Sequence, residues 1–267
     1  LMARPRDGHD MRLLDSNLSV SPLAEIRWAF DTFGNSVAYL TFLETASELV
    51  IDSVLTLRRY GYDDPIERLA RHSGPFPFLY SDDERVDLAP MMALSFPGDR
   101  AVLKGWLAQA VPDVCGEAIA LLEALSTAIY EGMTYIRREQ MGVQTPGETI
   151  AMASGTCRDF ALLFIEAARF FGFGARFVTG YLYDQGSAAD GISFSGGGST
   201  HAWADVFVPG AGWVEFDPTN RIVAGRNLLR VAVARTPAQA LPLSGTFSGE
   251  GASFLGMNVS VQVDRVE

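Results

Sequence analysis

Between positions 160 and 171 the apolar residues recur at intervals of three and four, which is the spacing of one buried face of an α-helix. The residues on this face are Phe160, Ala161, Leu163, Phe164, Ala167, Ala168 and Phe171. Thr156 is a favourable N-cap, Asp159 follows three positions later as in a capping box, and Gly172 marks the end. The pattern predicts a buried helix of roughly four turns that begins at Cys157.

Two segments after position 200 alternate with a period of two, which predicts β-strands. In the first, residues 200–208, one face carries His201, Trp203, Asp205 and Phe207. In the second, residues 213–218, one face carries Trp213, Glu215 and Asp217. The turn-forming stretch at 209–212 between them indicates a hairpin.

The length of the hairpin loop decides whether a histidine and a carboxylate can meet. With an odd-numbered loop, for example 208–212, Phe207 lies opposite Trp213. His201 and Asp217 are then diagonal neighbours on one face, at a backbone separation of ~7–8 Å that side chains can span. An even-numbered loop without a bulge would place them on opposite faces, so the register is a prediction that a structure can test.

The first sixty residues alternate more loosely and predict a small antiparallel β-domain. The expected strands cover 19–20, 26–30, 37–43 and 49–57, and residues 31–35 form a hairpin connection. Turn-forming residues follow at 63–65 and 74–77. We therefore expect a β-rich, sandwich-like domain at 1–62, a linker at 63–80 and a larger domain at 81–267 whose C-terminal strand returns to the first domain.

The larger domain is expected to open with helices. Ser81 and the three acidic residues after it predict a helix start, because negative charge suits the N-terminal end of the helix dipole. A second helix is expected at about 99–110 and a longer third one at about 115–138. The apolar stripe of the third helix is Ile119, Leu122, Ile129, Met133 and Ile136. Further strands are expected at 228–233 and near 257–263.

The composition is that of a folded globular protein, with 48% hydrophobic, 11% aromatic and 20% charged residues. The length of 267 residues fits one or two domains, and we expect two. The 21 basic and 32 acidic residues give a net charge of −11. This charge argues against non-specific binding of nucleic acid or of an anionic membrane, because both need a basic surface.

Membrane and compartment signals are few. No run of 18 apolar residues is present, which argues against a transmembrane helix, and the first ten residues are polar rather than typical of a signal peptide. Because the first residue is Leu, the natural start of the chain is an open question. Two cysteines in a chain of this size give no disulfide framework, so a reducing compartment, the cytoplasm, is the default expectation. The sequence indicates no oligomeric state.

Cys157 is the candidate nucleophile, because the exposed N–H groups of a helix N-terminus stabilise a thiolate. The competing interpretation is a small buried apolar residue, since free cysteines are commonly buried. Cys115 also lies near an expected helix start, but no base follows it closely. Among the three histidines, His9 is in the polar N-terminal tail and His72 is in the expected linker, so only His201 lies on a strong strand with a carboxylate in reach.

Three motifs resemble the transglutaminase-like superfamily, in particular its bacterial cysteine proteases. They are Gly-Thr-Cys-Arg-Asp-Phe-Ala at 155–161, Thr-His-Ala-Trp-Ala-Asp-Val at 200–206 and Gly-Trp-Val-Glu-Phe-Asp-Pro-Thr-Asn at 212–220. The N-terminal strands resemble the β-rich domain that accompanies these enzymes, and the end of the chain resembles their closing strand. The resemblance implies a papain-like α+β core with Cys157 as nucleophile, His201 as base and Asp217 as orienting acid.

The resemblance does not identify the side chain that completes an oxyanion hole. Tyr130, Tyr135 and Gln144 all precede the cysteine and are open alternatives, each of which has a plain structural interpretation. The backbone N–H of Cys157 is a further candidate donor. The Gly- and Ser-rich loop at 186–199 lacks the Lys-Ser/Thr ending of a phosphate-binding loop, so we interpret it as a connector.

The expected chemistry is acyl transfer through a thioester, with a peptide or protein as substrate and without a cofactor or metal. If water resolves the thioester, the enzyme is a protease or amidase; if a lysine amine resolves it, the enzyme is a transglutaminase. We expect hydrolysis, because water is always available and no feature dedicated to an amine is evident. Competing hypotheses are a zinc site formed by the same three side chains and a binding module that kept the fold without catalysis.

Overall fold

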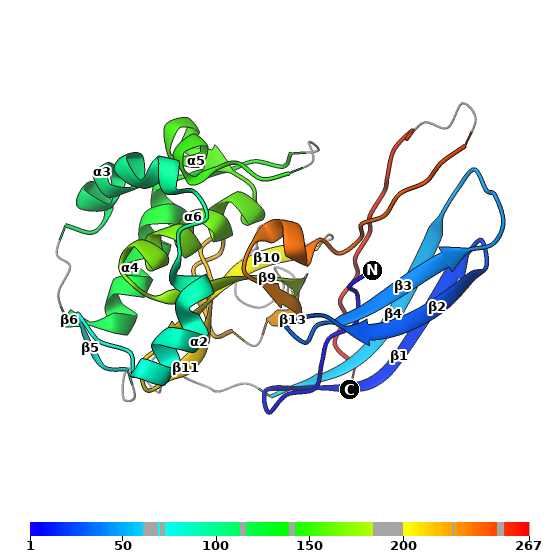
Figure 1. Ribbon diagram of the computed structural model, residues 1–267, viewed down its shortest axis with the longest axis horizontal. Helices are drawn as coiled ribbons and strands as arrows, with labels where there is room; N and C mark the ends of the chain where they lie inside the picture. Colours follow the sequence, from blue (N-terminus) through cyan, green and yellow to red (C-terminus); the bar gives the residue numbers. More distant parts are fainter. Residues whose placement is uncertain are drawn as a thin grey trace.

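The structure is a computed structural model of the 267-residue chain, and it describes residues 1–60, 69, 73–112, 116–138, 142–183, 200–225, 227–249 and 254–266. Helices gather at one end of the molecule and four N-terminal strands at the other, with a five-stranded sheet between them (Figure 1). Both chain ends lie on the side of the N-terminal strands. No helix within the described residues is long and apolar enough to cross a bilayer.

The four N-terminal strands form two separate antiparallel pairs, β1 with β4 and β2 with β3. Their bounds are β1 Met11–Ser21, β2 Ala24–Phe30, β3 Ser36–Phe42 and β4 Val50–Arg59. The three predicted strands at 26–30, 37–43 and 49–57 are confirmed to within a few residues. The first strand is longer than predicted, because its pairing with β4 runs back to Met11, where the sequence alternates poorly.

The helices and short strands of the middle of the chain come next. They are β5 Pro75–Phe76, α2 Asp82–Met92, η1 Pro97–Asp99, α3 Arg100–Ala110, β6 Gly116–Glu117, α4 Ala118–Gly132, β7 Thr134–Tyr135, α5 Pro146–Met152, β8 Ser154–Gly155 and α6 Cys157–Phe170. The predicted start of α2 is confirmed, since the Ser81 hydroxyl accepts the Glu84 N–H and the Glu84 carboxylate accepts the Ser81 N–H. The predicted helix at 99–110 is confirmed as α3.

The five-stranded sheet is antiparallel throughout, in the order β12-β11-β10-β9-β13. Its strands are β9 Gly174–Leu182, β10 His201–Val208, β11 Gly212–Asp217, β12 Ile222–Val223 and β13 Leu228–Ala234, after which η2 covers Pro237–Ala240. Helix α6 packs on β9 and β10. The predicted α+β class is therefore confirmed.

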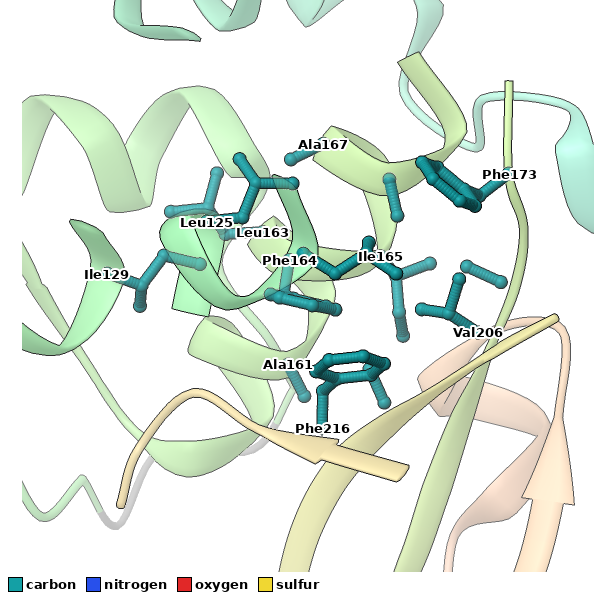
Figure 2. Close-up of a cluster of buried hydrophobic side chains, with 14 of the residues drawn as sticks. Leu125, Ile129, Ala161, Leu163, Phe164, Ile165, Ala167, Phe173, Val206 and Phe216 are labelled. Atoms are coloured by element: carbon teal, nitrogen blue, oxygen red, sulfur yellow. The ribbon is translucent and has the colours of Figure 1, made fainter. Parts of the chain in front are cut away.

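The main core lies between α6, α4 and one face of this sheet (Figure 2). Phe164 of α6 stacks on Phe216 of β11, with ring centroids 5.3 Å apart. Val206 of β10 and Leu125 of α4 are fully buried in the same cluster. Apolar burial of this extent is the main source of stability for the fold, and it fixes the helix that begins at Cys157 against the strands that carry His201 and Asp217.

Three predictions about elements were wrong or incomplete. The third helix ends at Gly132 rather than near 138, because Thr134 and Tyr135 leave it to pair with Ser154 and Gly155 as parallel strands β7 and β8. Helix α5 and strand β9 were not predicted. Residues 257–263 form no strand, although the sequence predicted one there. The division into domains and the return of the last strand stay predictions.

The second half of the expected linker packs closely on the helical part. Phe76 and Phe78 both contact Phe173, with ring centroids 5.9 and 4.7 Å apart. The Tyr80 hydroxyl donates to the Phe207 carbonyl at 2.6 Å and accepts the Gly174 N–H at 3.0 Å. Residues 63–68 and 70–72 of the expected linker lie outside the described residues.

One asparagine links the N-terminal strands to the sheet. The Asn35 side chain donates to the Val233 carbonyl at 2.6 Å and accepts the Val233 N–H at 2.9 Å, so it pairs with β13 as a backbone strand would. Asp31 holds this side chain by a third hydrogen bond of 2.8 Å, and Gly34 supplies the left-handed backbone of the turn, with φ at +74°. The predicted hairpin connection at 31–35 thus also serves as a contact between the two regions.

Candidate active site

Cys157 is a free thiol and occupies the first position of α6, as predicted, with only 7% of its surface exposed. The Asp159 carboxylate accepts the Thr156 N–H and the Thr156 hydroxyl, both at 2.8 Å, so the predicted pairing of these two residues at the helix start is confirmed. The backbone N–H of Cys157 lies in the first turn, where a helix offers no acceptor. It is therefore available to bind an anionic atom next to the sulfur.

Asp159 also ties the preceding segment to the nucleophile. Its carboxylate accepts the Gln144 backbone N–H at 2.6 Å and the Arg138 guanidinium at 2.9 Å. The carboxylate is fully buried and paired with opposite charge, an arrangement that is strongly destabilised when one partner is lost. From the sequence, Asp159 was predicted only as a cap residue. Its partners Arg138 and Gln144 lie in a preceding segment, and no local sequence pattern links that segment to Asp159.

His201 and Asp217 meet as the odd-numbered loop predicted. The register pairs Phe207 with Trp213 and Val208 with Gly212, which places both residues on one face. Their side chains are fully buried, and His201 Nε2 lies 2.8 Å from Asp217 Oδ2. The Thr219 N–H donates to the other Asp217 oxygen at 2.9 Å, so the carboxylate is fixed in orientation.

The imidazole of His201 is strongly basic. Burial alone would lower the pKa of His201, but the Asp217 carboxylate and the Cys157 thiol outweigh it and raise the pKa to about 10. Because Asp217 occupies Nε2, the nitrogen left for the thiol is Nδ1, which is buried and makes no hydrogen bond of standard geometry within the described residues. Cys157 is thus close enough to influence the ring without forming an ideal hydrogen bond to it.

Trp203 covers the imidazole on the same strand face. Its ring stacks on His201, with centroids 6.0 Å apart and an angle of 29° between the planes, and the side chain is fully buried. Gly180 lies opposite His201 on β9, and a Cβ there would meet the Leu229 carbonyl oxygen at 2.1 Å and the Trp203 ring at 2.7 Å. The absence of a side chain at Gly180 therefore lets β13 and the Trp203 ring pack directly against β9 at this position.

The structure distinguishes the three residues that the sequence left open for the oxyanion hole. Tyr130 is 50% exposed at the surface of α4. The Gln144 amide is engaged elsewhere, because it contacts Met152 Sδ at 3.1 Å and accepts the Thr149 hydroxyl at 3.3 Å. Tyr135 lies beside the start of α6, because it pairs with Gly155 across β7 and β8 and its ring contacts Phe160 with centroids 6.4 Å apart. Burial raises the pKa of Tyr135, and the nearby Cys157 and Asp217 add to the shift.

The remaining sequence candidates lie outside the site or outside the described residues. His9 is exposed in the N-terminal segment. Cys115, His72 and the Gly/Ser-rich loop at 186–199 fall on residues that the structure does not describe. Within the described part of the chain, no group of three or more His, Cys, Asp and Glu side chains is arranged to hold a metal ion.

Known protein families match two parts of the chain. Residues 107–218, which include all three candidate catalytic residues, match the transglutaminase-like superfamily, and residues 1–58 match the bacterial transglutaminase-like N-terminal region. The chain therefore carries a match to the N-terminal region of bacterial transglutaminase-like proteins, followed by a match to the core of the transglutaminase-like superfamily.

Relatives and structural neighbours extend the comparison. The uncharacterized protein ML0607 of Mycobacterium leprae is 33% identical over 126 residues, which are 47% of this chain and 43% of that protein. The uncharacterized protein Rv2569c of Mycobacterium tuberculosis is 33% identical over 133 residues, 48% of this chain and 41% of that protein. These matches therefore span less than half of either relative's length.

A solved structure has a similar fold over most of the chain. It is a candidate cysteine protease from Cytophaga hutchinsonii, which superposes with a TM-score of 0.68 at 22% sequence identity. The superposition covers 90% of this chain and 76% of that one. At this level of identity the likeness establishes the fold.

Proposed function

We propose that the protein hydrolyses amide or peptide bonds with Cys157 as nucleophile, His201 as base and Asp217 as orienting acid. The observation that carries this proposal is the buried 2.8 Å contact between His201 and Asp217, beside a thiol that raises the basicity of the same imidazole. The match of residues 107–218 to the transglutaminase-like superfamily, which covers all three residues, supports it.

The first half of the reaction forms a thioester. His201 Nδ1 takes the thiol proton, and the Cys157 sulfur attacks the substrate carbonyl carbon, so that a C–S bond forms. The negative charge that develops on the carbonyl oxygen is stabilised by the Cys157 backbone N–H and, in this proposal, by the Tyr135 hydroxyl. The C–N bond then breaks, and the imidazolium gives its proton to the leaving amine.

The second half releases the acid. His201 takes a proton from water, and the resulting hydroxide attacks the thioester carbon. The C–S bond then breaks, the sulfur leaves as a thiolate, and the imidazolium returns its proton to it, which restores the thiol and the neutral imidazole. Throughout both halves Asp217 keeps Nε2 protonated and the ring aligned, which is the role of the carboxylate in any such triad. Replacing water by a lysine amine in this half would give an isopeptide bond instead of an acid.

Two experiments test the proposal. Iodoacetamide at about pH 6 should label Cys157 far faster than Cys115, and His201→Ala should abolish the difference, because the thiolate depends on the imidazole. Equal labelling of the two cysteines would refute activation, as expected for a binding module without catalysis. A stoichiometric amount of zinc in the purified protein would favour a metal site instead.

Mass spectrometry of peptide products then defines the reaction. Incubation of a peptide library with the wild-type protein should yield shortened peptides or new carboxylic acids, and Cys157→Ser should yield neither. The same incubation with a glutaminyl peptide and a primary amine distinguishes the alternative. A product that contains the amine would identify acyl transfer as the activity, and its absence beside a hydrolysed product would identify hydrolysis.

A further inference from the structure

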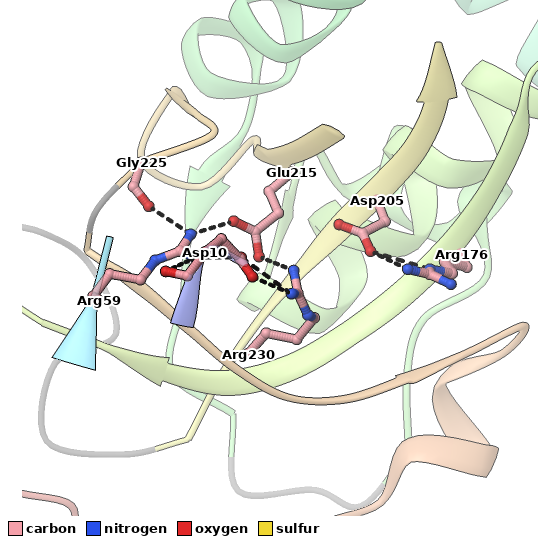
Figure 3. Close-up of polar contacts among 7 residues, drawn as sticks. All are labelled: Asp10, Arg59, Arg176, Asp205, Glu215, Gly225 and Arg230. Atoms are coloured by element: carbon pink, nitrogen blue, oxygen red, sulfur yellow. Dashed lines mark hydrogen bonds and ion pairs between the residues drawn. The ribbon is translucent and has the colours of Figure 1, made fainter. Parts of the chain in front are cut away.

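Four charged side chains form a closed ring outside the candidate active site (Figure 3). Glu215 accepts Arg59 Nη2 at 2.9 Å on one oxygen and Arg230 Nη1 at 3.0 Å on the other. Asp10 closes the ring, because its Oδ2 accepts Arg230 Nη2 at 3.1 Å and is also bonded by Arg59 Nη1. Each carboxylate bridges both arginines, and the ring has no net charge.

The ring connects regions that are distant in sequence. Asp10 directly precedes β1 and Arg59 ends β4, whereas Glu215 belongs to β11 and Arg230 to β13. In the sheet order, β10 and β9 separate β11 from β13. The N-terminal strands therefore reach across the sheet and bind side chains of two strands that are not neighbours in the sheet.

Glu215 depends on these partners for its charge. Its side chain is almost fully buried, and burial raises its pKa to about 7, with the neighbouring carboxylates Asp205 and Asp10 adding to the shift and the two arginines opposing it. A buried ion is tolerated only when its partners are placed well, and a hydrogen-bonded network of this kind makes the elements that it joins more rigid. Loss of one member would leave the others free to move.

Glu215 stands next to the candidate catalytic residues. It lies two positions before Asp217 on β11, so both side chains point to the same face of the sheet. Phe216, between them, points to the other face and stacks on Phe164 of α6. The end of β11 is thus held from one side by the helix that carries Cys157 and from the other by the charged ring.

We propose that Asp10 and Arg59 are positioning residues for the catalytic triad: through Glu215 they fix the end of β11 so that Asp217 faces His201. This inference rests on the proposed function. The N-terminal strands are then a working part of the catalytic unit, although Asp10 and Arg59 touch neither the substrate nor the reacting atoms.

The test uses Asp10→Asn in the full chain, with Asn35→Ala as matched control. Both variants weaken the contact between the N-terminal strands and the sheet, but Asn35 contacts β13 and leaves the ring intact. The rate of Cys157 alkylation and of peptide hydrolysis is measured from pH 5 to about pH 11, the range in which histidine and thiol groups titrate. Thermal unfolding at each pH confirms that the protein is folded.

For Asp10→Asn we expect kcat/KM to fall roughly 2- to 30-fold, the range of couplings transmitted through packed elements, with KM little changed. The decline of the rate at high pH should also begin at lower pH, because a looser Asp217 contact lowers the pKa of His201. Asn35→Ala should lower the unfolding temperature without shifting this decline. Asp10→Glu, which retains the charge, should restore part of the rate.

Distinct outcomes contradict the two proposals separately. Wild-type protein whose Cys157 reacts no faster than Cys115 would refute the proposed function. An active wild type combined with an unchanged rate and pH profile in Asp10→Asn, or with equal shifts in Asp10→Asn and Asn35→Ala, would refute the positioning role alone. If Asp10→Asn does not fold, Arg59→Lys serves instead, and it should shift the profile in the same direction by a smaller amount.

Discussion

His201 and Asp217 are 16 positions apart in the sequence, yet their side chains meet at 2.8 Å because β10 and β11 form one antiparallel hairpin. Neither side chain is exposed to solvent. In this environment the carboxylate is not screened by water, so its effect on the imidazole is large. The basicity of His201 is therefore a property of the hairpin register, and any change in that register would alter it.

Asp217→Asn should reduce kcat/KM by about 10²- to 10⁴-fold, because the amide keeps the shape of the side chain but neither carries charge nor fixes the tautomer. The rate should also decline at lower pH than in the wild type, since the pKa of His201 falls. Steady-state kinetics as a function of pH check both effects. Asp205→Asn, a buried neighbour on β10 that pairs with Arg176, is the control and should retain its pH profile.

Stability should depend on pH through His201. The pKa is about 10 in the folded protein against 6.5 for an ordinary histidine, so protonation of the ring favours the folded state. This contribution is fully present below pH 6.5 and is lost as the pH rises through about 10. Urea denaturation at several pH values gives the free energy of unfolding of the wild type and of His201→Gln. The difference between the two should become smaller as the pH rises across this window. A difference that stays constant would contradict the raised pKa of His201.

Tyr135→Phe should lower kcat by about 10²-fold if the hydroxyl stabilises the developing oxyanion, the usual loss when one such donor is removed. The unfolding temperature should hardly change, because the ring keeps its edge-on contact with Phe160, at a centroid distance of 6.4 Å. Tyr130→Phe on the exposed face of α4 is the matched control and should be fully active. Equal activity of the two variants would exclude Tyr135 from the oxyanion hole.

Gly180→Ala should destabilise the protein by about 1–3 kcal/mol, as overpacking of a filled core does. The added methyl group would collide with the Leu229 carbonyl and with Trp203, and displacement of Trp203 would also expose His201 to water. Gly105→Ala in α3 is the control, and it should change the free energy of unfolding in the opposite direction. No atom lies within 4 Å of the new methyl group, and alanine favours a helix over glycine, so stability should rise by about 0.5–1 kcal/mol. Chemical denaturation of the two variants and the wild type measures both changes in the free energy of unfolding.

Local patterns in the sequence were sufficient for the parts of the site that depend on local structure. The start of α6 at Cys157 followed from a cap residue and a helical period, and the meeting of His201 with Asp217 followed from strand alternation and one loop length. Sequence reading left the oxyanion donor open, and the proximity of Tyr135 to Cys157 emerged only from the pairing of β7 with β8.

The features that sequence reading missed depend on contacts between distant segments. Strand β9 is buried on both faces and shows no simple alternation, and the short β7 appeared to continue the helix before it. Asp10 and Arg59 were not singled out in the sequence, because nothing near them in the chain indicates their partner Glu215. Residues 257–263 alternate as a strand does, yet they have no partner strand within the described residues.

The three side chains of the proposed triad are buried to different depths, with 7% exposure for Cys157, 1% for His201 and 0% for Asp217. A reagent arriving from solution therefore reaches the Cys157 sulfur before the His201 ring nitrogens. Histidine-directed acylating reagents should modify His9 readily and spare His201 for as long as the molecule stays folded. A peptide bound over the Cys157 sulfur would block the remaining access of solvent to His201. The proton on the imidazole could then leave only by transfer to the reacting groups.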